Sequence, residues 1–540
     1  MSEKKRKRKE KLSIYLVRDP NKIESEIINT ENAMQPIDIE LPDIESARLY
    51  IKKHPPKNIP PWTRLFTDNT SVDKLAFGTS SSVGAVFIVK LLGNIFILSF
   101  GTGFHLLKDD AIERDFGLKV TLNSVDPDKL RSLDKASYDH NPLNSRTQST
   151  IDVDIFNLHL DSETEMLYAI TGTSLIPEFG LNVTGRDALT VAVETTLDTL
   201  PKILEISLSQ YKKKLPSKFS WVENINRVRD LDEIEILDME LDSCLSNNNY
   251  NGIWLGEPEI IDWENQIGYS FDTGQRVPRH PVLSLNDYID HIDRDELTVE
   301  RMKLDTIYVN NNDYQPTKQW SVYRCIYAEI VYSGNIYILR NGTWYRVNTM
   351  FTESIDKYLM DINIYPNELP EYSHEREEDY NIFVCDSDSS FCLMDKRNIK
   401  IGGAYDKIEH CDLIRNGNEF IHVKFYRSSG TLSHLFSQGL VAAEAFIKDA
   451  WYREQLNPKL PTSIKLDDPT KRPTPSNYNI VYAIATNKNI PNELPFFSKV
   501  TLKNALIMLR ALDYKVSLAQ IKIEPSLFAK KFFRPQKVRK

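Results

Sequence analysis

Residues 408–426 read IEHCDLIRNGNEFIHVKFY, and this stretch predicts the fold of the C-terminal part of the chain. Two short runs rich in β-branched and aromatic residues flank Asn416-Gly417-Asn418, a pattern typical of a β-hairpin. A loop of small residues follows at 428–430, and a helix is expected to begin near Ser433. We therefore expect a compact unit of strand, turn, strand, loop and helix.

The hairpin carries polar residues at strand positions where core residues are expected, and its register is open. If the loop has three residues, Asp412 lies opposite His422. His410 then lies opposite Lys424, and all four side chains share one face. If the loop is a two-residue turn, Glu409 faces Lys424 and Asp412 points to the other side. A half-exposed hairpin with one polar face is the simpler alternative to a functional site.

The residue types around the hairpin suit metal-dependent cleavage of phosphodiester bonds. Asp395, Glu409 and Asp412 are candidate carboxylates for Mg²⁺ or Mn²⁺. Lys424 is the candidate to orient or help deprotonate the attacking water, and Gln438 on the following helix is a polar group that could face the sheet.

This arrangement resembles the PD-(D/E)xK superfamily of restriction-like nucleases, in which an acidic residue precedes a (D/E)xK strand and a helix with a Gln. Asp412 matches the first acidic position, Lys424 the lysine and Gln438 the helical glutamine. Glu375 or Glu378 matches the acidic residue of the preceding helix. The resemblance covers residues 395–440 and implies a nuclease core.

The middle position of that motif departs from the pattern, because His422 stands where an acidic residue is expected. Imidazole prefers Zn²⁺ or Mn²⁺-class metals to Mg²⁺. We expect Asp412, Glu409 and His422 as the metal ligands, with Mg²⁺ or Mn²⁺ as cofactor. Lys424 and Gln438 complete the implied catalytic set.

A second resemblance extends over nearly the whole chain. It rests on ERDFGL at 113–118, FSWV at 219–222, IEHCDL at 408–413, SHLFSQG at 433–439 and LPFFSK at 494–499. These peptides resemble an uncharacterised, sporadically distributed bacterial family of similar length that travels with mobile elements and defence genes. The resemblance implies a bacterial antiphage accessory protein with possible partner defence proteins, and it supplies no reaction.

Charge is distributed unevenly along the chain. Residues 421–540 contain 20 Lys/Arg and 8 Asp/Glu, a net +12, so the formal net charge of −9 leaves −21 for residues 1–420. A basic segment on an acidic body predicts a nucleic-acid partner, DNA favoured over RNA, although two solvated basic tails are the simpler alternative. The candidate phosphate contacts are Arg427, Lys530, Lys531 and Arg534.

Composition predicts a folded cytoplasmic protein. The chain of 540 residues is 41% hydrophobic and 26% charged, and its 5 cysteines form no CxxC pair. The start of the chain is charged and lacks the apolar region of a signal peptide. The most apolar stretch, 85–100, is interrupted by Lys90 and a Gly93-Asn94 turn, so it predicts a buried hairpin and no membrane partner. The oligomeric state is left open.

The fold class we expect is mixed α and β (α+β), multidomain, with a restriction-endonuclease-like αβ core in the C-terminal part. The expected organisation is a basic disordered tail at 1–12, an N-terminal domain at 13–300 and a C-terminal domain at 301–540. The last contains the nuclease-like core at about 370–460 and a basic β-α end unit at 479–540.

Local patterns add further expectations. A helix end running into a strand is expected over 113–123, a long helix over 186–211, and a strand meander over 322–347. Gly101-Thr102-Gly103 lacks the third glycine of a dinucleotide fingerprint and predicts a structural turn.

Three functions remain in view. The leading hypothesis is an Mg/Mn-dependent endonuclease acting in defence. The alternatives are a non-catalytic nucleic-acid-binding or sensing subunit, in which His422 marks lost catalysis, and a protein-interaction subunit or another enzyme.

Overall fold

The computed structural model divides the chain into two compact units, Met1–Ala136 with Asn144–Val222, and Ser137–Leu143 with Glu223–Lys540. Each unit is described by itself. The structure describes residues 9–53, 83–108, 110–137, 144–155, 158, 160, 162, 165–250, 252–259, 261, 266–274, 276–292, 296–311, 315–400, 407–426, 429–525 and 527.

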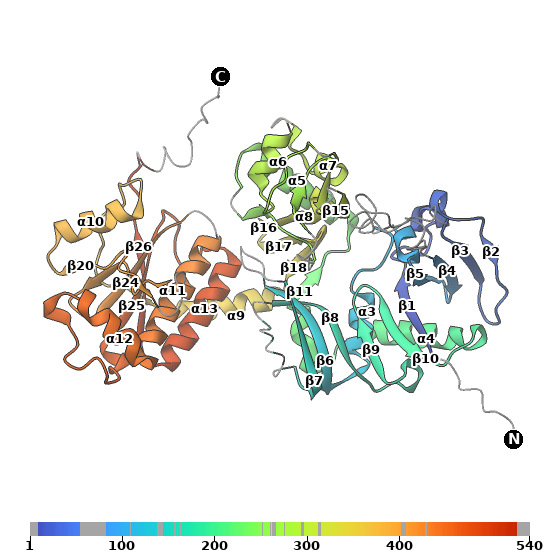
Figure 1. Ribbon diagram of the computed structural model, residues 1–540, viewed down its shortest axis with the longest axis horizontal. Helices are drawn as coiled ribbons and strands as arrows, with labels where there is room; N and C mark the ends of the chain where they lie inside the picture. The colour runs from blue at the N-terminus through green and yellow to red at the C-terminus, as the bar shows by residue number, and fades with distance from the viewer. Residues whose placement is uncertain are drawn as a thin grey trace, which may run out of the picture. The chain divides into compact units, whose positions relative to one another are not determined.

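The first unit is built on a ten-stranded sheet in the order β2-β3-β4-β5-β1-β10-β9-β8-β6-β7, labelled in Figure 1. The helices at 116–122 and 200–212 pack on one face, where Phe116 and Leu204 join the sheet's Leu98 in one apolar core. Ile27 of the short helix at 24–27 packs with Val86 and Ile97 in a second core. The strands are β1 Glu10–Leu16, β2 Ile37–Asp38, β3 Ser46–Ile51, β4 Gly84–Leu91, β5 Asn94–Gly101, β6 Val125–Ser137, β7 Asn144–Val153, β8 Glu165–Ser174, β9 Asn182–Gly185 and β10 Leu189–Val193. The helices are α1 Glu24–Ile27, α3 Phe116–Leu122 and α4 Leu200–Lys212.

The predicted hairpin at 85–100 is confirmed. Strands β4 and β5 pair antiparallel with Leu91 opposite Asn94. The Gly101-Thr102-Gly103 segment closes against β4, and a Cβ on Gly103 would lie 2.1 Å from the Ala85 carbonyl oxygen. The close approach of the two backbones requires glycine there, which supports the structural interpretation of this turn.

Two local predictions in this unit are wrong. The 113–123 segment ends in helix α3 where a strand was expected, because Phe116 and Val120, four residues apart, pack into the core on a helical spacing. The 186–211 segment is strand β10 followed by helix α4. Leu189, Val191 and Val193 alternate with less buried residues along that strand, the two-residue period of a sheet.

The first part of the second unit holds two antiparallel sheets. The meander predicted over 322–347 is confirmed as β16, β17 and β18, which pair in succession. The five-stranded sheet has the order β11-β18-β17-β16-β12 and the three-stranded sheet the order β13-β14-β15. Their strands are β11 Ile225–Arg227, β12 Ile253–Leu255, β13 Gly268–Ser270, β14 Thr306–Asn310, β15 Pro316–Ser321, β16 Ile326–Tyr332, β17 Asn335–Arg340 and β18 Thr343–Val347, with helices α5 Leu231–Ser246, α6 Leu285–His291, α7 Val299–Leu304 and α8 Val322–Cys325.

The structure places no boundary at residue 300. Strand β13 pairs with β14, and β12 with β16, so both pairings join residues on the two sides of that point. Tyr288 and Trp344 belong to one buried core. The division between the units falls at Val222–Glu223 because apolar packing ties the acidic 230–305 region to the strands from β14 onward.

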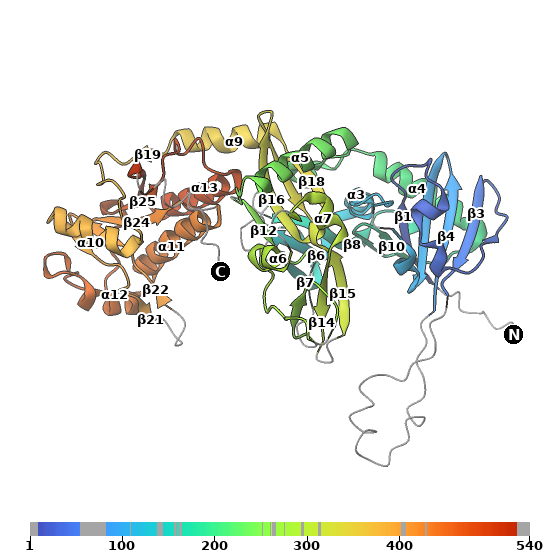
Figure 2. The ribbon, with the colours of Figure 1, turned by 90° about the horizontal axis from the view of Figure 1, so that it is seen from above.

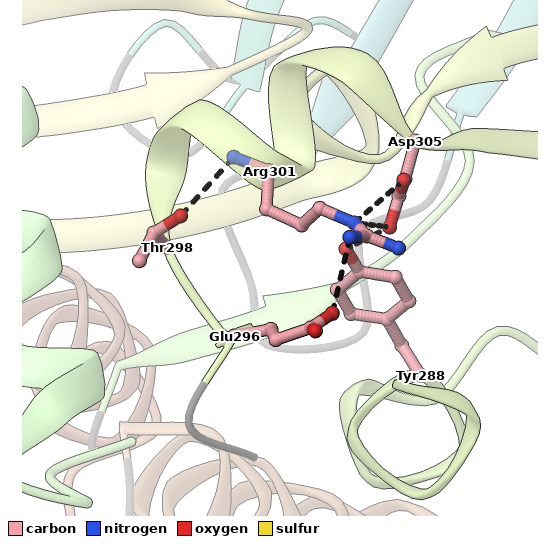
Figure 3. A network of polar contacts seen from close by, with 5 residues as sticks. All are labelled: Tyr288, Glu296, Thr298, Arg301 and Asp305. Carbon is pink, nitrogen blue, oxygen red and sulfur yellow. Dashed lines mark hydrogen bonds and ion pairs between the residues drawn. The ribbon is translucent and has the colours of Figure 1, made fainter. Parts of the chain in front are cut away.

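A polar network centred on one arginine fixes α7 within this part of the fold (Figure 3). The Arg301 Nε donates to both carboxylate oxygens of Asp305 at 2.9 and 2.8 Å, and its Nη1 donates to Glu296 at 3.0 Å. The Tyr288 hydroxyl donates to Asp305 at 2.9 Å, and Thr298 caps the helix by accepting from the Arg301 N–H at 3.1 Å.

The last part of the second unit is a six-stranded mixed sheet, in the order β19-β26-β25-β24-β23-β20, with helices on both faces (Figures 1 and 2). Its strands are β19 Asn363–Ile364, β20 Phe391–Leu393, β23 Leu413–Arg415, β24 Glu419–Phe425, β25 Asn479–Ala485 and β26 Lys515–Ile521, and β21 Ile399–Lys400 pairs with β22 Lys407–Ile408 in a separate hairpin. The helices are α9 Thr349–Met360, α10 Glu377–Ser387, α11 Ser429–Lys448, α12 Ala450–Leu456 and α13 Phe496–Ala511.

The centre of this sheet is parallel and buried on both faces. Strand β24 pairs parallel with β25, and β25 with β26, and six successive residues of β25 from Ile480 onward are buried. Apolar runs of this kind are typical of parallel strands covered on both sides. Val423 and Phe425 face α10, whereas Phe436 of α11 packs on Tyr482 from the other side.

The register of the β23–β24 hairpin is the three-residue one. Leu413 pairs with Ile421 and Arg415 with Glu419, and the N–H of Asp412 donates to the Ile421 carbonyl at 3.0 Å. Asn416 has a φ of 51° and Gly417 a φ of 80°, the left-handed conformations that these two residue types tolerate best. Asp412 therefore lies opposite His422.

In the described part of the chain no helix combines the length and apolar character needed to cross a bilayer. The 5 cysteines are free thiols.

Candidate functional site

Three carboxylates converge where β20, β22 and β23 meet. Asp395 lies just after β20, Glu409 directly follows β22, and Asp412 directly precedes β23. One oxygen from each lies within 4.8 Å of the others. The backbone brings them together because the N–H groups of Met394 and Asp395 both donate to the Asp412 carbonyl, at 2.8 and 3.0 Å. We call Asp395, Glu409 and Asp412 the acidic cluster.

Uncharged groups donate hydrogen bonds to all three carboxylates of the acidic cluster. Asn381 of α10 donates to Asp395 at 3.2 Å, and Gln438 of α11 donates to Glu409 at 3.0 Å. The backbone N–H of Val423 donates to Asp412 at 2.7 Å. Glu409 also accepts from the backbone N–H of Lys396 at 2.5 Å. Helices on both faces of the sheet thus orient the carboxylates by amide groups.

The cluster is electrostatically crowded. Burial raises the pKa of Glu409, and the charge of Asp395 raises it further. The pKa of Asp412 is raised well above its ordinary value by burial and by the charges of Glu409, Asp395 and Glu377. Like charges in a low-dielectric setting favour the protonated form, and a divalent cation at the same place would reverse that preference.

Lys424 pairs with a carboxylate from outside the strands. Its Nζ lies 2.8 Å from an oxygen of Glu377, the first residue of α10, and the other oxygen of Glu377 accepts the Phe425 N–H at 3.1 Å. Val423, the chain neighbour of Lys424, donates its N–H to Asp412 at 2.7 Å, so this pair lies beside the acidic cluster.

His422 is not in the acidic cluster. Its side chain is 1% exposed, its ring lies 6.0 Å from that of Tyr482, and neither ring nitrogen has a hydrogen-bond partner among the described residues. Burial lowers the pKa of His422 to about 4, so the ring is neutral at physiological pH. His410, expected on the same face, is also buried and lies 3.2 Å from the Tyr452 hydroxyl.

The acidic cluster has the donor set of a site for a hard divalent cation. Carboxylate oxygens are the ligands that Mg²⁺ and Mn²⁺ prefer, and three of them together are costly to keep ionised without a cation. An ammonium group and a second carboxylate stand beside the cluster. Such a set could bind a metal and a phosphate group together and polarise a bound water.

The structure brings three of the predicted residues together, Asp412, Glu409 and Gln438, and places Lys424 on the neighbouring strand. Asp395, a candidate carboxylate at the sequence level, joins them. Glu377 was missed in favour of Glu375 and Glu378. Glu378 forms an ion pair with Lys396. The signal that could have identified Glu377 is its place at the start of a helix, but four acidic residues stand within 375–379.

The predicted nucleic-acid contacts Arg427, Lys530, Lys531 and Arg534 lie outside the described residues, as does most of the basic tail that begins the chain.

Comparison with known proteins gives a family and no activity. A family model described as "Family of unknown function (DUF6119)" matches residues 12–522. No curated protein and no solved structure matches the chain.

Proposed function

Since the chain belongs to this family of unknown function, no relative supplies a reaction, and we propose one from the geometry. The protein is a metal-dependent nuclease of a bacterial antiphage or mobile-element defence system that hydrolyses phosphodiester bonds, with DNA favoured over RNA. Its catalytic centre is the acidic cluster together with Lys424 and Glu377.

The observation that carries this proposal is the pairing of two features at one end of a sheet. Three carboxylate oxygens converge within 4.8 Å, and Lys424 is held 2.8 Å from Glu377 beside them. A lysine paired with a glutamate is by itself an ordinary structural salt bridge. An acidic cluster by itself can bind a cation but lacks a group that orients a nucleophile. Their combination suits hydrolysis of an anionic ester.

The order of elements also supports the proposal. Asp412 directly precedes β23, Lys424 lies on the next strand and Gln438 on the helix that follows, which is the order that the resemblance to restriction-like nucleases implies. The acidic residue that the motif places two positions before the lysine is absent, and Asp395 and Glu409 offer the missing carboxylates from neighbouring segments.

The roles follow from the contacts. Asp395, Glu409 and Asp412 would hold Mg²⁺ or Mn²⁺, which when bound neutralises phosphate charge and lowers the pKa of a coordinated water. Lys424 orients the attacking water, and Glu377 fixes the lysine and is placed to accept the proton that the water loses. The new bond joins the water oxygen to phosphorus, and the bond to the leaving oxygen breaks.

The direct test uses the purified full chain with plasmid, linear DNA and RNA, in EDTA, Mg²⁺ or Mn²⁺. Wild type should cleave only with metal. Lys424→Ala should lower the rate by about 100- to 10,000-fold, the range for loss of a proton-transfer or orienting group, while binding falls little. Lys448→Ala is the matched control, since Lys448 lies on α11 and pairs only with Glu444 in the described part of the chain.

The defence role is tested in a strain where wild type protects against phage. Loss of protection in Lys424→Ala, with protection retained in Lys448→Ala, is expected. Equal protection by Lys424→Ala and wild type would make this lysine structural and would contradict the proposal.

A second candidate, a non-catalytic nucleic-acid sensor, is favoured by one observation, the neutral buried His422 at an acidic position of the motif. In that case no condition gives cleavage, and Lys424→Ala affects binding no more than any other single lysine does. Metal dependence separates the two, because a nuclease cleaves when Mg²⁺ or Mn²⁺ is added and a sensor cleaves under no condition.

A further inference from the structure

A hollow of about 650 Å³ lies on the sheet of the first unit, over neighbouring strands β6, β7, β8 and β9 (labelled in Figure 1). Its volume falls within the range of about 300–1,000 Å³ typical of small-molecule sites. All its lining residues belong to the first unit, so the hollow is independent of the acidic cluster.

The two faces of these strands differ in chemistry. Leu133, Ile170 and Val183 point into the apolar core and are at most 1% exposed. Most of the lining of the hollow comes from the opposite face, where Asp134 lies across from Arg146 and Thr171 lies across from Thr184, and Leu133 and Ile170 also border the hollow. Directly opposed residues of neighbouring antiparallel strands share one face of a sheet. The hollow is therefore a polar concavity built on a rigid support.

Two guanidinium groups converge on one carboxylate in this hollow. Asp134 is only 8% exposed. Arg146 binds it in a two-pronged manner, with distances of 2.7 and 2.9 Å, and Arg186 forms an ion pair with the same carboxylate. The side chains of Arg146 and Arg186 are 55% and 52% exposed, so their remaining N–H groups are open to solvent.

This arrangement leaves an unbalanced positive charge. Two guanidiniums share one carboxylate, which gives the trio a net charge of +1. A third arginine at the rim, Arg131, is balanced by Asp152 at 2.5 Å. Asp134 also anchors both arginine heads, so little side-chain freedom is lost when a ligand binds. Planar guanidinium groups recognise phosphate oxygens by paired hydrogen bonds.

We propose that this hollow is a binding site for a phosphate group, with Arg146 and Arg186 as its recognition residues. The hydroxyls of Ser132, Thr171 and Thr184 add neutral donors around it. Among the described residues that line the hollow none is aromatic, so they offer no stacking surface to a base and recognise phosphate without base identity. The phosphate can come from a free nucleotide or from a nucleic acid.

The test measures binding by the full chain in EDTA, at low salt, so that the acidic cluster holds no metal. The probes are inorganic phosphate, AMP, UMP, and one oligonucleotide with a 5′-phosphate or a 5′-hydroxyl. The double variant Arg146→Gln/Arg186→Gln should bind at least about tenfold more weakly than wild type. AMP and UMP should bind alike.

Arg48→Gln is the matched control, because Arg48 is an exposed arginine of the same unit, paired with Asp38 and Glu24 away from the hollow. It should bind like wild type. If the double variant fails to fold, Arg146→Lys keeps the charge, loses the two-pronged geometry and should still weaken binding several-fold.

Binding of nucleotides and oligonucleotides alike would support a free phosphate ligand, and binding of oligonucleotides alone would identify a nucleic-acid phosphate. The proposal is overturned if no probe binds wild type, or if the double variant binds as tightly as Arg48→Gln.

Discussion

Two groups of carboxylates in the second unit have opposite charge balance. In the network of Figure 3, Arg301 lies between Asp305 and Glu296, and a tyrosine hydroxyl satisfies the same carboxylate. In the acidic cluster, amide and backbone N–H groups donate hydrogen bonds to Asp395, Glu409 and Asp412. In the first group the cation is bonded directly to two of the carboxylates, whereas Lys424, beside the second group, is bonded to Glu377.

The difference shows how a structural network can be told from a candidate site. A carboxylate whose cation is part of the chain stabilises the fold and resists a ligand. Carboxylates that are held by neutral donors and face one another repel each other when no cation is added. Burial and this repulsion raise the pKa values of Glu409 and Asp412. Polar residues alone do not make a site, since both groups are equally polar.

The largest expected effect is on cleavage. Asp412→Asn should lower the metal-dependent rate by about 100-fold or more, because it removes a ligand charge and keeps the side-chain shape. Asp305→Asn, the same substitution in the other group, should leave the rate unchanged. A nuclease assay on both variants measures this, and an equal loss in the two would remove the distinction between the groups.

The next effect is metal-dependent stabilisation. Adding Mg²⁺ or Mn²⁺ at about 100 times its dissociation constant should raise the free energy of unfolding by about 2.7 kcal/mol. Asp412→Asn should lose most of that gain, and Asp305→Asn should keep it. Denaturant titration with and without EDTA gives the values, and an unchanged midpoint on adding metal to wild type would speak against a metal centre.

A smaller effect has opposite sign in the two groups when metal is absent. Asp412→Asn should raise the melting temperature by a few degrees, because it relieves repulsion among the carboxylates. Asp305→Asn should lower it by a similar amount, since Arg301 loses its two-oxygen partner. Thermal unfolding in EDTA decides this, and shifts of the same sign would contradict the charge argument.

The smallest effect is the pH dependence of stability. Raised pKa values mean that the folded state holds protons on Glu409 and Asp412 more tightly than the unfolded state does. Their stabilising contribution is therefore present at low pH and is lost as pH rises through the raised values. In EDTA, Glu409→Gln/Asp412→Asn should show a flatter fall in stability than wild type as pH increases. Slopes that are equal would refute the assignment of these protons.

The sequence predicts local structure well where the spacing of apolar residues and the residue types typical of turns indicate the same element. The Gly93-Asn94 hairpin, the 322–347 meander and the strand at 480–484 are confirmed, since each combines an apolar run with a strong turn signal. The prediction of one long helix over 186–211 was wrong because a strand and a helix follow each other there with only a short break. Their combined apolar content resembles one long amphipathic helix.

The candidate site could be predicted only in part. Asp412, Lys424 and Gln438 follow from the motif, but the loop length that sets their register was open. Asp395 and Glu409 meet because a separate hairpin brings the chain back between them, which no local pattern reports. Glu377 reaches Lys424 from 47 residues away in sequence, and neighbouring acidic residues made it one choice of several.

The turn at residues 416–418 has a consequence for how this gene can vary. Arg415 pairs with Glu419, and an odd number of residues lies between them. In this register the side chains of Asp412 and Lys424 project on compatible sides of the sheet. Losing or gaining one residue there reverses the parity of β24, which exchanges Lys424 with its apolar neighbours Val423 and Phe425. Changes in the length of the turn are therefore not tolerable, and a side chain at Gly417, with its φ of 80°, is strained as well. Among descendants of this gene, the number of residues in the turn should therefore stay fixed.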